Sequence, residues 1–222
     1  MTTPSARMMR PVDRAIGTAL ERPTRAALEV SDLPTVVFGS RDLIWWGTIG
    51  FMIVEGITLS ICLIAYVYVR RNFDAWPPHG TPMPSLVVPT LSLAVLLAVL
   101  IPTRLFDRAG KRLDEHAVRL WLWVATAITA VACVLRFLEF RAVNVRWDSN
   151  AYGSAVWMTL ITHFTLLIAD LFESGTLALI FTLGRHEPKH FVDATNNAFY
   201  TYFMVLVWVV PYLIIYWMPR WL

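Results

Sequence analysis

The chain has 222 residues, of which 57% are apolar and 16% are charged. Because soluble domains carry about 25% charged residues, this composition excludes an ordinary water-soluble domain and indicates a membrane protein. The formal net charge of +3 is small. No basic stripe with interleaved aromatic residues occurs, which excludes a nucleic-acid-binding protein.

The first forty residues form a polar arm. The arm contains five arginines but lacks the continuous apolar segment of a cleavable secretory signal, so we expect it to be retained. Prolines at positions 4, 11, 23 and 34 interrupt it. We therefore predict a largely irregular cytoplasmic arm over residues 1–40, with at most a short amphipathic helix around 12–20.

Five apolar stretches in residues 41–222 are long enough to cross the hydrocarbon core as helices, which takes about 20 residues. They cover about 43–69, 86–103, 117–138, 155–183 and 194–218. The sequence therefore predicts an all-α integral membrane bundle of five transmembrane helices. Pro89 and Pro102 lie near the two ends of the second stretch, where a proline is tolerated at the start and coincides with the end of a helix.

Lysines and arginines divide unequally between the two sets of alternating loops. The set that includes the N-terminal arm carries twelve of them, and the other set carries five. Cytoplasmic loops are enriched in these residues. We therefore predict a cytoplasmic N-terminus and a C-terminus on the outer side.

Ionisable side chains inside the predicted spans are the first candidates for a functional site. A charge at bilayer depth costs several kcal/mol unless it is paired or faces protein, so each of these residues requires a partner. Glu55 lies near the middle of the first span and Asp170 near the middle of the fourth. The full set is Glu55, Arg136, Glu139, His163, Asp170 and Glu173.

His163, Asp170 and Glu173 lie at spacings of seven and three residues. These spacings place them within a sector of roughly 80° on one helix face, which must point into the bundle or against another subunit. Three interpretations remain open: hydrogen bonding between helices, a proton relay that also uses Glu55, and a metal site with one histidine and two carboxylates. The absence of any HxxxH or ExxH pair in the spans disfavours the metal site.

The remaining polar residues of the spans favour structural roles. Arg136 and Glu139 are three residues apart and can form an ion pair along one helix. Asn196 and Asn197 are expected to cap the last helix. Cys62 and Cys133 are expected to pack in the core, because neither has a partner at metal-ligand spacing. No nucleophile elbow, phosphate-binding glycine loop, CxxC or HExxH motif occurs, so we expect no catalytic residues and no metal site in this chain.

Four short motifs occur in a fixed order between residues 41 and 217. They are Trp46-Gly47 followed by Phe51 and Glu55, then Trp76-Pro77-Pro78-His79-Gly80, then Phe137 to Phe140 with Glu139, and last Tyr152-Gly153-Ser154 followed by His163, with Trp208 in the final span. In this order and spacing the chain resembles the cytochrome c oxidase subunit III family, in its short five-helix bacterial form.

The chain departs from the family pattern at several polar positions. Leu166 stands where the family has a second histidine, and Tyr202 and Val205 replace the histidine and aspartate of a motif in the last helix. Asp170 and Glu173 are additions. The polar network inside this bundle therefore differs from the usual one.

The resemblance implies an accessory, non-catalytic subunit of a haem-copper terminal oxidase that oxidises cytochrome c or quinol in aerobic respiration. Such a subunit binds the large haem-bearing subunit, holds no haem or copper itself, binds phospholipid, stabilises the catalytic core and aids proton uptake. It lies in the bacterial inner (cytoplasmic) membrane. Two alternatives remain: an accessory subunit of a nitric oxide reductase, and an independent membrane metalloenzyme or ion carrier built on Glu55, His163, Asp170 and Glu173.

Overall fold

The computed structural model describes residues 36–184 and 186–221, and the irregular arm and short helix predicted within residues 1–35 lie outside them. The described part contains five helices long and apolar enough to cross a membrane, and no strand. They are α2 (Leu43–Arg70), α3 (Val87–Lys111), α4 (Glu115–Ala142), α5 (Ala151–Thr182) and α6 (Pro188–Tyr212), which continues through η2 (Leu213–Trp217) and α7 (Met218–Trp221). The predicted all-α bundle of five spans is confirmed, and its orientation in the membrane stays a prediction.

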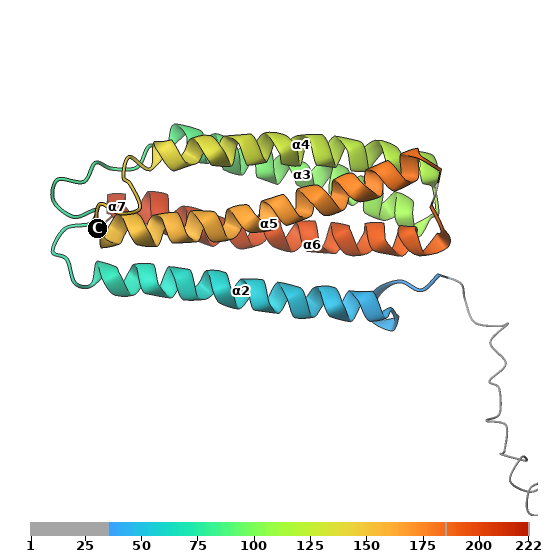
Figure 1. Cartoon of the computed structure of the whole chain (residues 1–222), viewed down its shortest axis with the longest axis horizontal. Helices are drawn as coiled ribbons and strands as arrows, with labels where there is room; N and C mark the ends of the chain where they lie inside the picture. The colour runs from blue at the N-terminus through green and yellow to red at the C-terminus, as the bar shows by residue number, and fades with distance from the viewer. Residues whose placement is uncertain (1–35, 185, 222) are drawn as a thin grey trace, which may run out of the picture. The chain divides into compact units, whose positions relative to one another are not determined.

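The five helices form three layers (Figure 1). α2 packs on α5 and α6, which separate it from α3 and α4. Half of the most apolar 18-residue window in α6 to α7 is buried within the bundle, against 17% in α2. α6 is therefore the central helix, and most of the surface of α2 faces outward. α2 begins at one end of the bundle, here named the N-terminal end, and α7 finishes at the other, here named the C-terminal end.

α3 is longer than its apolar stretch. It runs through Pro102 to Lys111, so the expected end near Pro102 is wrong. A proline removes one backbone donor and crowds the preceding turn, but here Pro102 is buried within the bundle and packing against α4 and α6 holds the helix together. Beyond the apolar residues, Lys111 pairs with Asp107 one turn earlier, with Nζ 2.8 Å from Oδ2.

α6 begins six residues before the apolar stretch predicted from residue 194. Pro188 occupies its first turn, and Glu187 and His190 form a capping box at its start. The prediction that Asn196 and Asn197 cap this helix is therefore wrong, because both lie in its interior and are buried. Asn196 instead donates from Nδ2 to Oδ2 of Asp42, the N-cap of α2, at 3.0 Å.

Two of the sequence motifs meet at the C-terminal end of the bundle. Trp76, in the loop after α2, donates from Nε1 to the Tyr66 hydroxyl at 2.8 Å and packs edge-on against Tyr152, with ring centroids 4.9 Å apart. Asn150, the N-cap of α5, also donates from Nδ2 to the Thr81 hydroxyl at 2.9 Å. These contacts fix the loop between α2 and α3 against the start of α5. Pro77 is buried in the same loop, Pro78 is half-buried, and Gly80 adopts a left-handed turn with φ of 84°.

Gly153 allows the loop before α5 to approach the helix closely. A Cβ atom at this position would lie 2.2 Å from the backbone oxygen of Arg146. The next residue, Ser154, donates from Oγ to the backbone oxygen of Trp147 at 2.6 Å. The Tyr152-Gly153-Ser154 motif therefore acts through packing of this loop.

We expect Gly153→Ala to lower the free energy of unfolding by about 1–3 kcal/mol, because the added methyl group forces the loop away from α5. Gly50→Ala is the matched control: no atom lies within 4 Å of a Cβ built there, and alanine favours a helix over glycine by roughly 0.5–1 kcal/mol. Thermal unfolding of both variants in detergent checks the prediction. Equal unfolding temperatures for the two variants would contradict it.

Candidate functional site

A fully buried arginine lies between α4, α5 and α6. Arg136 of α4 has no exposed side-chain surface, and its Nη1 donates to Oε2 of Glu139 at 2.7 Å. The guanidinium carbon also lies 3.8 Å from the ring centroid of Trp208 on α6, a cation–π contact. The predicted ion pair along α4 is therefore present, and it is enclosed by protein on all sides.

The second oxygen of Glu139 is also occupied. The Tyr216 hydroxyl, in the π-helical segment η2, donates to Oε1 of Glu139 at 2.6 Å. A carboxylate that accepts from both an arginine and a tyrosine is a satisfied buried anion, so the pair carries no net charge and both oxygens are hydrogen-bonded.

His163 is fixed by two hydrogen bonds that determine its tautomer. Its Nε2 lies 3.0 Å from the backbone oxygen of Met204, and its Nδ1 lies 3.2 Å from Nη2 of Arg136. A carbonyl oxygen only accepts and a guanidinium only donates, so Nε2 carries the hydrogen and Nδ1 accepts. His163 is therefore a neutral ring with both nitrogens occupied, and neither is available to a metal ion.

The three residues of the predicted stripe, His163, Asp170 and Glu173, lie in different environments. His163 contacts Arg136, whereas Asp170 accepts a hydrogen bond from the Thr201 hydroxyl of α6 at 2.6 Å. Glu173 is exposed and lines a groove at the N-terminal end of the bundle. The three residues span a sector of roughly 80°, so Glu173 at its edge lies outside the buried face of α5. The stripe is therefore not one hydrogen-bonded network.

Glu55 of α2 faces α6. Its side chain is buried, and Tyr200 donates from its hydroxyl to Oε1 at 3.0 Å. Within the described residues, Oε2 has no hydrogen-bond partner. This contact joins the outer helix to the centre of the bundle through a carboxyl group at mid-membrane depth.

Asp170 and Glu173 lie beside a polar face of α6. Asp193, Asn197 and Thr201 recur at intervals of four residues, which places them in a row along that face. Thr201 has a single hydroxyl hydrogen but lies within hydrogen-bonding distance of two acceptors, Asp170 at 2.6 Å and the backbone oxygen of Asn197 at 3.0 Å. If Asp170 carried a proton, it could donate to the Thr201 hydroxyl oxygen, and Thr201 could donate to the backbone oxygen of Asn197.

The row begins at a groove between α2, α5 and α6. Its volume is about 400 Å³, and Glu173, Asp193 and Asn196 are among its lining residues. From Asp193 to Thr201 the row spans eight residues, or about 12 Å along α6. Polar side chains thus extend from the N-terminal end of the bundle to the depth of Asp170 and Glu55.

Among residues 36–184 and 186–221, no three histidine, cysteine, aspartate or glutamate side chains lie close enough together to hold a metal ion. The metal interpretation of the stripe therefore has no geometric basis. Cys62 is buried and Cys133 is half-buried, both as free thiols.

Sequence reasoning missed the partners that α6 and η2 provide. Tyr200, Thr201 and Tyr216 each donate to a buried carboxylate. Tyr200 lies well inside the apolar stretch, away from the headgroup depth where tyrosine is usually found. That displacement is a signal that could have identified Tyr200, whereas Tyr216 lies near the end of the last helix, where a tyrosine is ordinary.

The other residues of the first and last motifs differ in their exposure. Trp46 is exposed, and its Nε1 donates to the backbone oxygen of Ser40 at 2.9 Å. A Cβ atom on Gly47 would meet no atom within 4 Å. Trp208, in contrast, is fully buried beneath Arg136.

Relatives named "Cytochrome c oxidase subunit 3" cover most of this chain. The protein from Thermostichus vulcanus is 23% identical over 175 residues, which cover 78% of this chain and 87% of the relative. The protein from Synechocystis sp. is 23% identical over 184 residues, which cover 80% of this chain and 77% of the relative. The protein from Tragelaphus imberbis is 26% identical over 195 residues, covering 83% and 71%. Over most of its length the chain is similar to cytochrome c oxidase subunit 3.

No protein-family model matches the chain. With this relationship and the five apolar helices, the chain is a multi-pass membrane protein. The Trp76 and Tyr152 motifs, which carry the resemblance to subunit 3, form the packed C-terminal end of the bundle. Glu55 and Glu139 each accept a hydrogen bond from a tyrosine hydroxyl of the last helix.

We expect Glu139→Gln to lower the free energy of unfolding by about 3–5 kcal/mol, because it leaves the Arg136 cation buried without a counter-charge. The double variant Arg136→Met/Glu139→Leu should recover part of this loss, since no unpaired charge remains. Asp107→Asn breaks the partly exposed pair with Lys111 and should cost less than about 1 kcal/mol.

Thermal unfolding in detergent, monitored by size-exclusion elution, measures all three variants. An unfolding temperature of Glu139→Gln equal to that of the wild type would show that the buried pair does not stabilise the fold.

Proposed function

We propose that this chain is the accessory, non-catalytic subunit 3 of a haem-copper terminal oxidase in aerobic respiration. The observation that carries the proposal is its relationship to cytochrome c oxidase subunit 3 over 78% to 80% of its length, including 87% of the Thermostichus vulcanus protein. We place it in the bacterial inner membrane, with its N-terminus in the cytoplasm. The relatives are named as cytochrome c oxidase proteins, which supports this function over an accessory subunit of a nitric oxide reductase.

The state of the buried donor groups supports a non-catalytic role. Both nitrogens of His163 are occupied, by Arg136 and by the Met204 backbone, and Glu139 is bound by Arg136 and Tyr216. These groups hold helices together, and among residues 36–184 and 186–221 no buried histidine has a free nitrogen to ligate haem iron or copper. We therefore assign the haem and copper of the complex to the partner subunits.

A contribution to proton uptake is supported by the polar row on α6. The row leads from the groove lined by Glu173 and Asp193 to Asp170, and Glu55 lies at similar depth beside Tyr200. With the N-terminus in the cytoplasm, the groove opens on the cytoplasmic side. Carboxyl groups at successive depths can accept and release protons in turn, which is the arrangement found in intramembrane proton relays.

The complex itself provides the first test. Affinity purification of the tagged full-length chain in mild detergent should yield a preparation whose optical spectrum shows haem and whose oxygen consumption is active. The spectrum should disappear when a high-detergent wash removes the partner subunits, because the haem lies in them. Recovery of the chain without any haem protein would overturn the proposal.

The proton role has a separate test in the purified complex. Glu55→Gln and Asp170→Asn should leave the haem content per complex unchanged but lower the rate of proton uptake and shorten the active lifetime during turnover, because each removes a titratable carboxyl group. Glu115→Gln is the matched control, since Glu115 lies at the N-terminal end of α4 and pairs with His186 at 3.4 Å outside the polar row.

Unchanged proton uptake and unchanged lifetime in both Glu55→Gln and Asp170→Asn would reject the proton role and leave the subunit assignment standing. Loss of haem content in these variants would instead assign the two residues to assembly.

A further inference from the structure

Polar groups continue through the bundle beyond the end of the polar row. A second hydrogen-bonded chain lies toward the C-terminal end, here named the arginine chain, and its members are His163, Arg136, Glu139 and Tyr216. From Asp193 to Tyr216 the last helix advances 23 residues, or about 35 Å, against about 30 Å for the hydrocarbon core. Polar groups therefore occur at successive depths across a whole membrane.

A short apolar gap separates the polar row from the arginine chain. Asp170, which accepts from the last residue of the row, lies seven residues from His163 on α5, or about 10 Å along the helix axis. Leu166 and Leu167 lie between them and are buried. Apolar constrictions in membrane pores close by excluding water and conduct when water enters them. The tightness of this gap therefore depends on the groups at its two ends.

The outer end of the gap carries a cation. α4 runs from the N-terminal end of the bundle to the C-terminal end, so Arg136 precedes Glu139 in that direction (Figure 1). A proton that moves outward from Asp170 meets the guanidinium before it meets the carboxylate that neutralises it. Fixed positive charges, including arginine side chains, exclude protons and cations from selective membrane pores.

The arginine chain holds this cation but does not relay protons. A guanidinium only donates and does not lose its proton in proteins, so Arg136 cannot pass a proton on. Nδ1 of His163 already accepts from Arg136, and Nε2 donates to the backbone oxygen of Met204. A histidine needs a free lone pair to accept a proton, and His163 has none while these two bonds persist.

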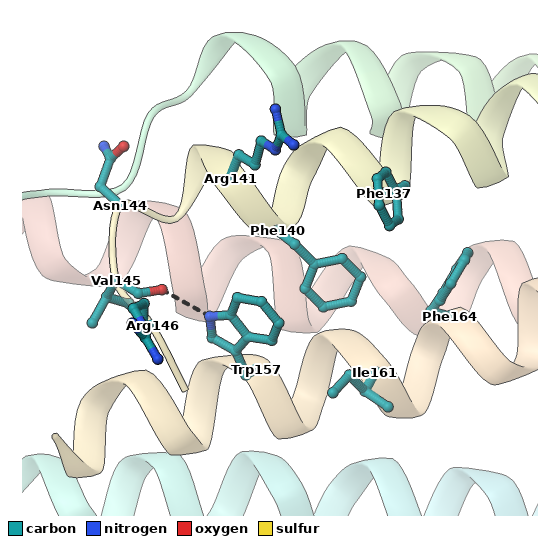
Figure 2. A pocket seen from close by; sticks show the side chains of 9 residues that line it. All are labelled: Phe137, Phe140, Arg141, Asn144, Val145, Arg146, Trp157, Ile161 and Phe164. Carbon is teal, nitrogen blue, oxygen red and sulfur yellow. Dashed lines mark hydrogen bonds between the residues drawn. The ribbon is translucent and has the colours of Figure 1, made fainter. Parts of the chain in front are cut away.

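Aromatic side chains separate the buried ion pair from the groove on the flank of α4 and α5. This groove has a volume of about 670 Å³, and neither Arg136 nor Glu139 is among its lining residues. Phe140, Trp157 and Phe164 lie between the two helices (Figure 2), with the Phe140 ring centroid 4.8 Å from that of Trp157 and 6.0 Å from that of Phe164. Water in the groove is therefore kept from the cation by a layer of rings.

We propose that Arg136 is an electrostatic barrier that stops protons at the inner end of the apolar gap, with Glu139 and His163 as its positioning residues. The inference rests on the proton role proposed for the polar row. Such a barrier lets the row deliver protons as far as Asp170 while the membrane stays insulated. A respiratory membrane requires both, because an unbroken polar path through the bundle would dissipate the proton gradient.

Passive proton flux through the purified full-length chain tests the barrier. The chain is reconstituted into liposomes that contain a pH-sensitive dye, and a potassium diffusion potential set by valinomycin drives the protons. The wild type should match protein-free liposomes. Arg136→Gln/Glu139→Gln keeps polar groups but removes both charges, and should raise the flux about tenfold because the barrier to protons is lost. Arg136→Lys retains a cation beside Glu139 and should stay at the wild-type rate.

Two further variants show which property of the site matters. Arg136→Met/Glu139→Leu removes the same charges but supplies apolar side chains, so it should stay as tight as the wild type. Adding Asp170→Asn to Arg136→Gln/Glu139→Gln should return the flux to the wild-type rate, because the polar row then lacks its last titratable group. Elution profiles and unfolding temperatures identify the folded variants. Arg136→Gln alone, in which Tyr216 can still donate to Glu139, replaces the double glutamine variant if that variant is unfolded.

A wild-type flux in the folded glutamine variant would overturn the proposal and assign the insulation to the apolar gap. Equal leaks in the glutamine and Arg136→Met/Glu139→Leu variants would also overturn it, since disturbed packing would explain both. A leak that persists with Asp170→Asn would separate the barrier from the polar row and reject the proposal. These measurements use the chain without its partners, so their failure leaves the subunit assignment standing.

Discussion

The bundle is organised around one buried charge. Arg136 has no access to solvent or lipid, and a guanidinium remains ionised under all ordinary conditions. Its position is tolerated only because Glu139 neutralises it, His163 accepts from it and Trp208 lies beneath it. These partners come from three helices, so the requirement to satisfy a single cation fixes how α4, α5 and α6 pack at this depth.

The last helix provides most of the partners on which the polar interior depends. Tyr200, Thr201 and Tyr216 donate to carboxyl groups on α2, α5 and α4 respectively. The helix changes to π-helical geometry at η2, where Tyr216 lies, two residues after Pro211. A proline removes one backbone hydrogen bond from a helix. A single π-helical turn can occur within an α-helix, and such turns are frequent at functional sites. The central place of α6 in the bundle follows from these contacts.

The two ends of the bundle have different chemistry. At the N-terminal end, the groove carries the carboxyl groups of Glu173 and Asp193 and leads inward along a polar face. At the C-terminal end, a groove between α4, α5 and the loop that joins them is lined by aromatic side chains and by Arg141 and Arg146. The first arrangement supports the proposed role in proton uptake, whereas the second groove has no carboxyl group among its lining residues.

The sequence by itself determined the five spans and the Arg136–Glu139 pair. These are local properties: a span depends on about 20 consecutive residues, and a pair three residues apart lies on one helix. Only the tertiary structure decided that Tyr216 joins Glu139, that His163 separates from Asp170 and that Glu173 faces a groove. The rotation of each helix about its axis determines such contacts, and packing against other helices sets that rotation. Hydropathy along a single helix does not.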